Sequence, residues 1–229
     1  MVEPLQIVKF SLVLMINLTL TRLLLRNLSY YLMDKGIYGI DINKEEKKKI
    51  PEEGGVSIVI SLTISFILLW GVFKCDWIWL IILTSILIST VGFIDHFRNI
   101  RPYPKFVYCA VIGSLYSFYI INNTQLHIIE LIIIIGVIAI GYSVLVNAYN
   151  LLAGFNGLKS GVTVIISIAL SIFFYLKGFT AEAAICVLVG GSYLVFWFLN
   201  KYPAKIFIGD SGTLLPLSIF IGLAIITRV

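Results

Sequence analysis

The stretch IIELIIIIGVIAIGYSVLVN, residues 128–147, is long and apolar enough to cross a membrane as one helix. It carries a single charged residue, Glu130, close to its beginning. Similar apolar stretches lie at roughly 5–26, 55–73, 77–94, 104–121, 161–177, 181–199 and 212–228. The sequence therefore predicts an all-α, polytopic transmembrane helical bundle of about eight spans, forming one integral membrane domain over residues 1–229.

The composition of the whole chain agrees with these spans. Of its 229 residues, 59% are hydrophobic and only 13% are charged, whereas a soluble domain is closer to half apolar and about a quarter charged. This excess excludes a disordered chain and argues against a soluble globular fold. The net charge of +5 is typical of loops that face the cytoplasm, so we expect no nucleic-acid partner.

The connections between the predicted spans alternate in charge. Lysines and arginines gather in the connections at about 27–54, 95–103, 148–160 and 200–211, whereas the other connections carry only Lys74 and Lys177. The positive-inside rule places the basic connections in the cytoplasm and the N-terminus outside. We therefore predict a multi-pass protein of the cell membrane with its polar face toward the cytoplasm.

The first polar motif is GFIDHFRNIRPYPK, residues 92–105, at the end of a predicted span. It combines Asp95 and His96 with the cations Arg98, Arg101 and Lys105. An isolated carboxylate at a membrane edge needs a partner, because desolvated charge is costly. The motif is suited to holding a divalent cation beside phosphate oxygens, or it is an interfacial loop with a helix-end anchor.

The second motif is NAYNLLAGFNGLKSG, residues 147–161. Asn147 and Asn150 would share one helix face, while Gly154 and Gly157 allow sharp turns and close approach of a ligand. Asparagine and glycine are also ordinary residues of helix ends and turns, so a purely structural interpretation stays open.

The third motif is FIGDSGT, residues 207–213, directly before the last predicted span. Asp210 lies at a helix N-terminus, where backbone N–H groups can face an anion, although a simple N-cap is the alternative. All three motifs fall on the same predicted membrane face, so Asp95, Asn150 and Asp210 could converge. Few carboxylates and an amide oxygen, completed by substrate phosphates, are typical of a single Mg²⁺ site, with Mn²⁺ as the alternative ion.

These motifs, with IPEEGG at residues 50–55, resemble those of the polyprenyl-phosphate N-acetylhexosamine-1-phosphate transferase family (glycosyltransferase family 4). The similarity covers nearly the whole chain, and residues 147–161 are close to the archaeal and eukaryotic form of the motif. The resemblance implies transfer of N-acetylhexosamine 1-phosphate from a UDP-sugar to a polyprenyl or dolichyl phosphate, with release of UMP. The expected partners are therefore these two substrates and membrane lipids.

The resemblance also implies roles for individual residues. Asp210 and Asn150 would hold magnesium on the diphosphate, and Asp95 stands where the family has the first residue of an Asp-Asp pair that deprotonates or orients the lipid phosphate. Lys105 would bind phosphate. The remaining substrate-binding positions, around the uracil and the phosphates, would be Asn147, Gly154, Asn156, Gly157, Phe207 and Arg101.

Two departures from the family pattern leave alternatives open. His96 replaces the second Asp of the pair, and imidazole is a poorer magnesium ligand than a carboxylate. We also expect the chain to be short at its C-terminus, because family members typically have ten helices and a basic loop between the last two. One alternative is a truncated or degenerate non-catalytic homologue, or a homodimer or partner chain that supplies the missing helices. A transporter is disfavoured, since internal repeats and mid-span charges are not seen in the sequence.

Overall fold

The computed structural model describes residues 4–40, 49–121, 127–152 and 155–228. Within these residues the elements, in chain order, are α1 (Pro4–Asp34), β1 (Tyr38–Ile40), β2 (Lys49–Pro51), α2 (Gly55–Phe73), α3 (Trp77–Arg98), α4 (Pro102–Ile121), α5 (Ile128–Asn150), α6 (Leu158–Leu176), α7 (Thr180–Asn200) and α8 (Gly209–Thr227). All eight helices are long and apolar enough to cross a membrane. The predicted polytopic helical bundle is thereby confirmed, and the protein is a multi-pass membrane protein.

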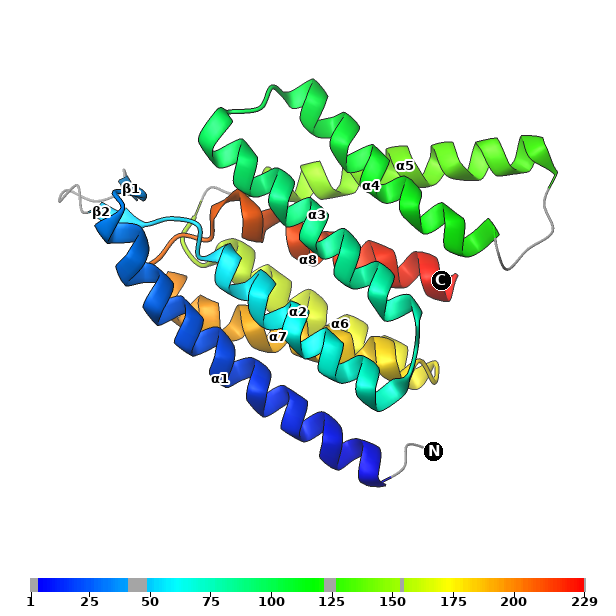
Figure 1. Ribbon diagram of the computed structural model, residues 1–229, viewed down its shortest axis with the longest axis horizontal. Coiled ribbons are helices and arrows are strands. Elements are labelled where there is room, and N and C mark those ends of the chain that lie inside the picture. Colours follow the sequence, from blue (N-terminus) through cyan, green and yellow to red (C-terminus); the bar gives the residue numbers. More distant parts are fainter. Residues whose placement is uncertain (1–3, 41–48, 122–126, 153–154, 229) are drawn as a thin grey trace.

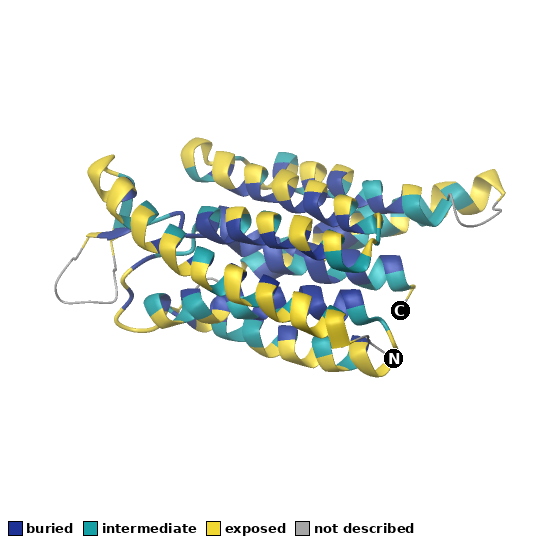
Figure 2. Ribbon diagram, turned by 60° about the horizontal axis from the view of Figure 1, so that its bottom comes forward, coloured by how far each residue is buried: buried dark blue, intermediate teal, exposed yellow. Residues whose placement is uncertain are grey.

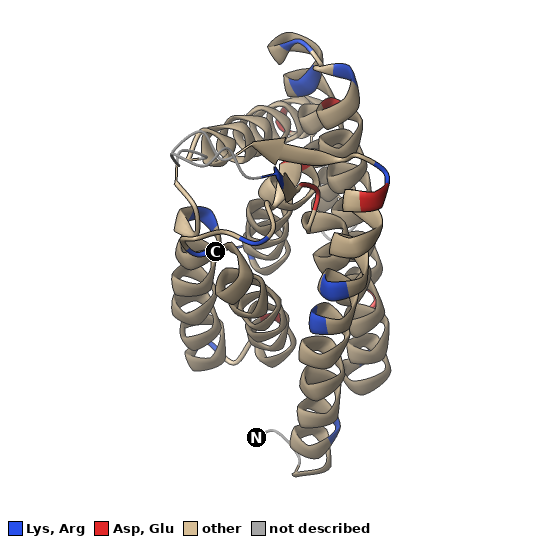
Figure 3. Ribbon diagram, turned by 90° about the vertical axis from the view of Figure 1, so that its left-hand side faces the viewer, with Lys and Arg blue, Asp and Glu red and all other residues tan. Residues whose placement is uncertain are grey.

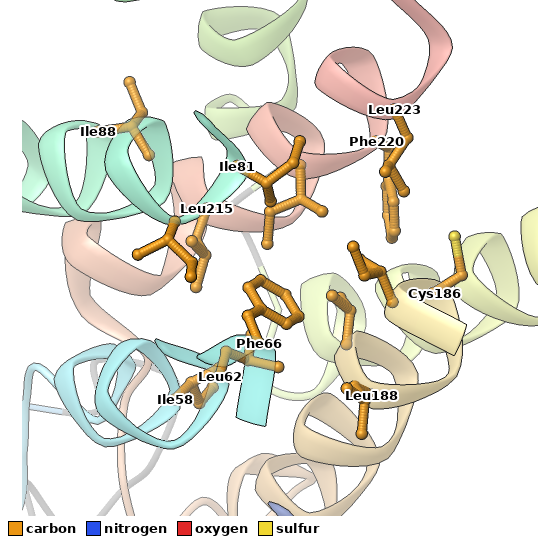
Figure 4. Close-up of a cluster of buried hydrophobic side chains, with 14 of the residues drawn as sticks. Ile58, Leu62, Phe66, Ile81, Ile88, Cys186, Leu188, Leu215, Phe220 and Leu223 are labelled. Atoms are coloured by element: carbon orange, nitrogen blue, oxygen red, sulfur yellow. The ribbon is translucent and has the colours of Figure 1, made fainter. Parts of the chain in front are cut away.

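Helices α7 and α8 are the most buried helices of the bundle. Figure 1 shows α3 and α8 between the α4–α5 pair on one side and α2, α6 and α7 on the other, with α1 outermost. Apolar side chains from α2, α3, α7 and α8, including Phe66, Ile81, Leu188 and Leu215, meet in the core (Figure 4). The outer helices keep exposed apolar faces (Figure 2), as expected where lipid replaces water.

Several helices extend further than their apolar stretches. Helix α1 runs to Asp34 instead of about residue 26, α3 includes Asp95 and His96, and α5 reaches Asn150. A helix keeps its backbone hydrogen bonds beyond the membrane edge until a residue breaks the pattern, and Asn99 ends α3 in a left-handed conformation with φ of 45°. The polar motifs consequently lie on helix ends, where the backbone holds their side chains in place.

A short antiparallel hairpin follows α1 and was not predicted. Strands β1 and β2 pair with Tyr38 opposite Pro51. The hairpin leads directly into residues 52–54 before α2, and the backbone of Phe207 pairs with this connection from the other side. The hairpin therefore joins the beginning of α2 to the segment that precedes α8.

The first turn of α8 lies very close to α2 and α3. A Cβ atom added at Gly55 would overlap the backbone of Gly212, and one added at Gly92 would overlap the backbone of Asp210. Small residues allow helix backbones to approach in this way inside a membrane. These contacts place the N-terminus of α8 between the ends of two neighbouring helices.

A buried polar network joins α1 to α2 and α7. Asn17 donates to the Ser65 hydroxyl at 3.0 Å and accepts from the Ser192 hydroxyl at 3.0 Å, while Thr21 bonds with Ser61 at 2.7 Å. Hydrogen bonds between polar side chains stabilise helix packing where water is absent. The network fixes how α1 packs on the rest of the bundle.

Candidate functional site at the polar end of the bundle

The three polar motifs of the sequence meet at the end of the bundle that carries the hairpin (Figures 1 and 3). The carboxylate of Asp210, in α8, interacts electrostatically with Lys105, Lys159, Asp95 and His96. These partners come from α3, α4 and α6, which are separated in the chain. The predicted convergence of the motifs is therefore present, while the chemical roles of their residues stay predictions.

Asp95 and Lys105 form a buried ion pair between α3 and α4. Lys105 Nζ lies 2.5 Å from Asp95 Oδ2, and the other carboxylate oxygen, Oδ1, accepts the backbone N–H of Ile100 at 2.7 Å. The turn at Asn99 folds α4 back so that Lys105 can reach the carboxylate. Arg101, predicted to bind substrate, lies exposed on this turn. Both oxygens of Asp95 are thus engaged in holding the turn and the lysine.

Asn150 links α5, α6 and α8 through a single oxygen. Its Oδ1 accepts from Lys159 Nζ at 3.2 Å and from the Thr213 hydroxyl at 2.9 Å. The Thr213 hydroxyl also lies 3.1 Å from the carbonyl oxygen of Asp210, one turn earlier in α8. Asn150 and Asp210, the two predicted metal ligands, are therefore brought together around Thr213.

The two predicted metal ligands differ in how free their oxygen atoms are, because Asn150 Oδ1 already accepts from Lys159 and Thr213. The Asp210 carboxylate is partly exposed and makes no hydrogen bond or salt bridge with any residue that the structure describes. Magnesium prefers hard oxygen ligands and usually takes few from protein, with phosphates and water completing its shell. Among the described residues, no group of three or more His, Cys, Asp or Glu side chains could hold a metal alone. Asp210 and Asn150 would therefore bind the ion together with substrate oxygens.

Glu53 is a member of the site that the sequence reasoning missed. Its side chain is fully buried, and its Oε1 accepts the backbone N–H of Asp210 at 3.1 Å and lies 3.5 Å from His96 Nδ1. Burial raises the pKa of the Glu53 carboxyl, and the neighbouring Ser211 hydroxyl and His96 partly offset this effect. The available signal was its position in the IPEEGG segment, which resembles the family but to which the sequence assigned no site residue.

Lys159 is a second residue that was quoted in a motif without a predicted role. It is only 5% exposed, and its ammonium group lies between Asn150 and the Asp210 carboxylate. Its backbone carbonyl accepts from the hydroxyl of the buried Tyr149 at 3.0 Å. A buried lysine with its charge facing the predicted metal ligands is a further candidate for contact with phosphate.

The glycine-rich connection before α6 has a defined conformation at Gly157. This residue has φ of +81°, and its N–H donates to Asn200 Oδ1 at 3.0 Å. A Cβ there would lie 3.1 Å from Lys201 Cα and 3.3 Å from Trp197 Nε1. Asn156 precedes it and is half-buried, while the predicted Gly154 lies outside the described residues.

Phe207 and Asn147, the two other residues predicted to contact the nucleotide, are fixed by hydrogen bonds of different kinds. Phe207 donates its N–H to Pro51 at 2.8 Å, and its carbonyl accepts from Gly54 at 2.9 Å. The Asn147 amide donates to the Ser143 carbonyl at 2.8 Å, one turn back in α5. The backbone of Phe207 therefore pairs with the connection before α2 that contains Glu53. The Asn147 side chain, in contrast, bonds within its own helix.

Comparison with known proteins relates this site to a family. Residues 78–228 match the family model described as glycosyl transferase family 4. A putative glycosyltransferase of Methanocaldococcus jannaschii is 34% identical over 194 residues, which cover 83% of this chain and 60% of the relative.

Bacterial enzymes are also similar to the chain. A phospho-N-acetylmuramoyl-pentapeptide-transferase of Vesicomyosocius okutanii is 30% identical, covering 78% of this chain and 60% of the relative. The corresponding protein of Chlorobium luteolum is 29% identical, covering 74% and 56%. The matched region thus spans 60% or less of the length of these curated relatives.

Proposed function

Because the chain belongs to glycosyl transferase family 4, we propose that it transfers N-acetylhexosamine 1-phosphate from a UDP-sugar to a polyprenyl or dolichyl phosphate at the cytoplasmic face, releasing UMP. The observation that carries the proposal is the convergence of Asp95–Lys105, Asn150–Lys159 and Asp210 at one end of the bundle. The cations Lys105 and Lys159, together with oxygen atoms of Asp210 and Asn150, suit the transfer of a phosphorylated sugar to a lipid phosphate.

The proposed reaction is a displacement at phosphorus. An oxygen of the lipid phosphate forms a bond to the β-phosphorus of the UDP-sugar. The bond between that phosphorus and the oxygen bridging to the α-phosphate breaks, and its electron pair leaves with UMP. Such a reaction depends mainly on positioning and on neutralisation of phosphate charge. Magnesium held by Asp210 and Asn150 would neutralise the diphosphate.

The protein's own residues would position the two phosphate groups. Asp95 holds Lys105, whose ammonium group interacts electrostatically with Asp210, so this lysine is ready to bind phosphate without a search for its conformation. Lys159, in α6, is also buried, and its ammonium group bonds to Asn150. Engagement of both Asp95 oxygens supports an orienting role for this carboxylate rather than proton abstraction.

The nucleotide would bind beside these cations. Gly157 brings the backbone close to the site, and Asn156 and Asn147 supply amide groups for the uracil. Phe207 would stack on the base, and the exposed Arg101 would contact the diphosphate or the lipid phosphate. These assignments extend the family pattern to the residues of this chain.

Release of UMP tests the proposal directly. Membranes containing the chain, supplied with UDP-GlcNAc and polyprenyl phosphate, should release UMP only with Mg²⁺ or Mn²⁺, and a chelator should abolish it. Asp210→Asn removes a charged ligand but keeps the size of the side chain. Equal release by the wild type and Asp210→Asn refutes catalysis by this chain and favours a non-catalytic binding homologue.

A further inference from the structure

Glu53 has a backbone conformation that is unusual for its residue type. Its φ is 65°, in the left-handed region that residues with a Cβ rarely adopt. Such conformations cost roughly 1–3 kcal/mol and persist where the surrounding structure over-determines them, often at functional sites. The side chain at this position is fully buried. Glu53 therefore combines a strained backbone conformation with a buried carboxylate.

The neighbouring glycines make room for this carboxylate. Gly209 has φ of +70°, and a Cβ there would overlap Glu53 Oε1 and Cδ. Gly54 and Gly55 follow Glu53 directly and donate their N–H groups to the carbonyls of Phe207 and Ile208. The connection before α2 is thus held against the segment before α8, with Glu53 between them.

The carboxylate of Glu53 contacts two groups of the proposed active site. Oε1 accepts the N–H of Asp210 and faces Nδ1 of His96. It caps the N-terminus of α8, which has no side-chain cap of its own residues. On the other side of the imidazole, Nε2 lies 3.9 Å from Glu52 Oε2.

We propose that Glu53 is a positioning residue that orients the His96 imidazole toward the reacting phosphates. His96 follows Asp95 in α3, and the Glu53 carboxylate reaches this imidazole from the connection before α2. Nδ1 of His96 faces Glu53, and Nε2 lies on the side of Glu52. The kinetic consequences of this proposal rest on the proposed function, but the contact itself does not.

The contact can be tested by NMR on the full chain. The sequence contains two histidines, so His127→Asn leaves His96 as the only one, and asparagine can still cap α5. Imidazole ¹⁵N spectra report which nitrogen carries the proton. We expect Glu53→Gln to shift the Nδ1 resonance of His96, whereas the matched control Glu52→Gln should move Nε2 and leave Nδ1 in place. An Nδ1 resonance unchanged by Glu53→Gln overturns the proposal.

The effect on turnover can be tested with a double-mutant cycle. Glu53→Gln keeps the side-chain size and an oxygen to cap α8, so the variant should fold; we expect kcat to fall roughly tenfold to a hundredfold with little change in KM for the UDP-sugar. If Glu53 acts through His96, adding Glu53→Gln to His96→Ala should cost much less than it does in the wild type.

The outcomes separate the two proposals. Fully additive effects on kcat, or a loss of thermal stability with unchanged kcat, would show that Glu53 only caps α8 and would overturn its positioning role. Absence of turnover in the wild type would defeat the proposed function instead, and the NMR experiment would then decide alone whether Glu53 orients His96.

Discussion

Gly92 of α3 lies directly against the backbone of Asp210 in α8, so close that a methyl group at residue 92 would overlap the Asp210 carbonyl. This contact joins the end of the helix that carries Asp95 to the beginning of the helix that carries the predicted metal ligand. Backbone packing therefore sets how closely the Asp95 end of α3 approaches the Asp210 end of α8.

Gly92→Ala should separate α3 from the first turn of α8. The clash is with backbone atoms that cannot rotate away, so we expect a loss of roughly 1–3 kcal/mol in stability and a large loss of UMP release. Thermal unfolding in detergent measures the first effect. Gly136→Ala is the matched control, because that helical glycine faces open space. Equal behaviour of the two variants would contradict the proposed close contact.

Lys105→Met should destabilise the protein because it leaves the buried Asp95 carboxylate without its partner. Removing one member of a buried pair costs roughly 3–5 kcal/mol. We expect the double variant Asp95→Asn, Lys105→Met to be more stable than Lys105→Met alone, as measured by thermal or denaturant unfolding. The exposed Arg101→Ala should change stability by less than roughly 0.5 kcal/mol. A double variant that is less stable than the single one would argue against the ion pair.

Thr213→Val should weaken the use of magnesium without unfolding the protein. The substitution keeps the shape of the side chain but removes the hydroxyl that orients Asn150. Residues that orient metal ligands typically contribute about tenfold or more to metal affinity, so the Mg²⁺ concentration for half-maximal UMP release should rise by roughly that factor. Thr227→Val, near the other end of α8, is the control, and a similar rise there would discredit the role of Thr213.

Phe207→Ala should impair nucleotide binding more than turnover. Stacking of a base on an aromatic ring contributes roughly 1–3 kcal/mol, so we expect KM for the UDP-sugar to rise several-fold or more while kcat changes less. Phe207→Tyr retains the ring and should behave nearly like the wild type. Steady-state kinetics of UMP release measure both constants, and an unaltered KM in Phe207→Ala would remove the stacking role.

Much of the bundle could be predicted because its physical cause is local. Apolar runs such as residues 128–147 must be helical in a membrane, where every backbone polar group needs an internal partner. The helix ends could not be predicted in the same way, since Asp95 and Asn150 are polar residues that continue a helix past its apolar part. Strands β1 and β2, of three residues each, are too short for a periodic signal.

The residues of the site also differ in whether the sequence alone could identify them. Asp95, Asn150, Lys105 and Asp210 stand out in the sequence because polar side chains at membrane edges are costly and need a reason. Glu53 was missed because its own surroundings in the sequence are acidic and look solvated. Its contacts with His96 and Asp210 join residues far apart in the chain, which no local pattern reports.

The order of amino acids was sufficient for the class of protein, the number of membrane helices in the described residues and the polar motifs that meet at one end of the bundle, since hydrophobicity and local spacing encode these properties. Which polar groups meet was settled by helix packing, through glycines that let backbones touch and a connection that inserts a strained glutamate between two helices. Burial and pairing depend on contacts between distant segments, and such contacts exist only once the chain has folded.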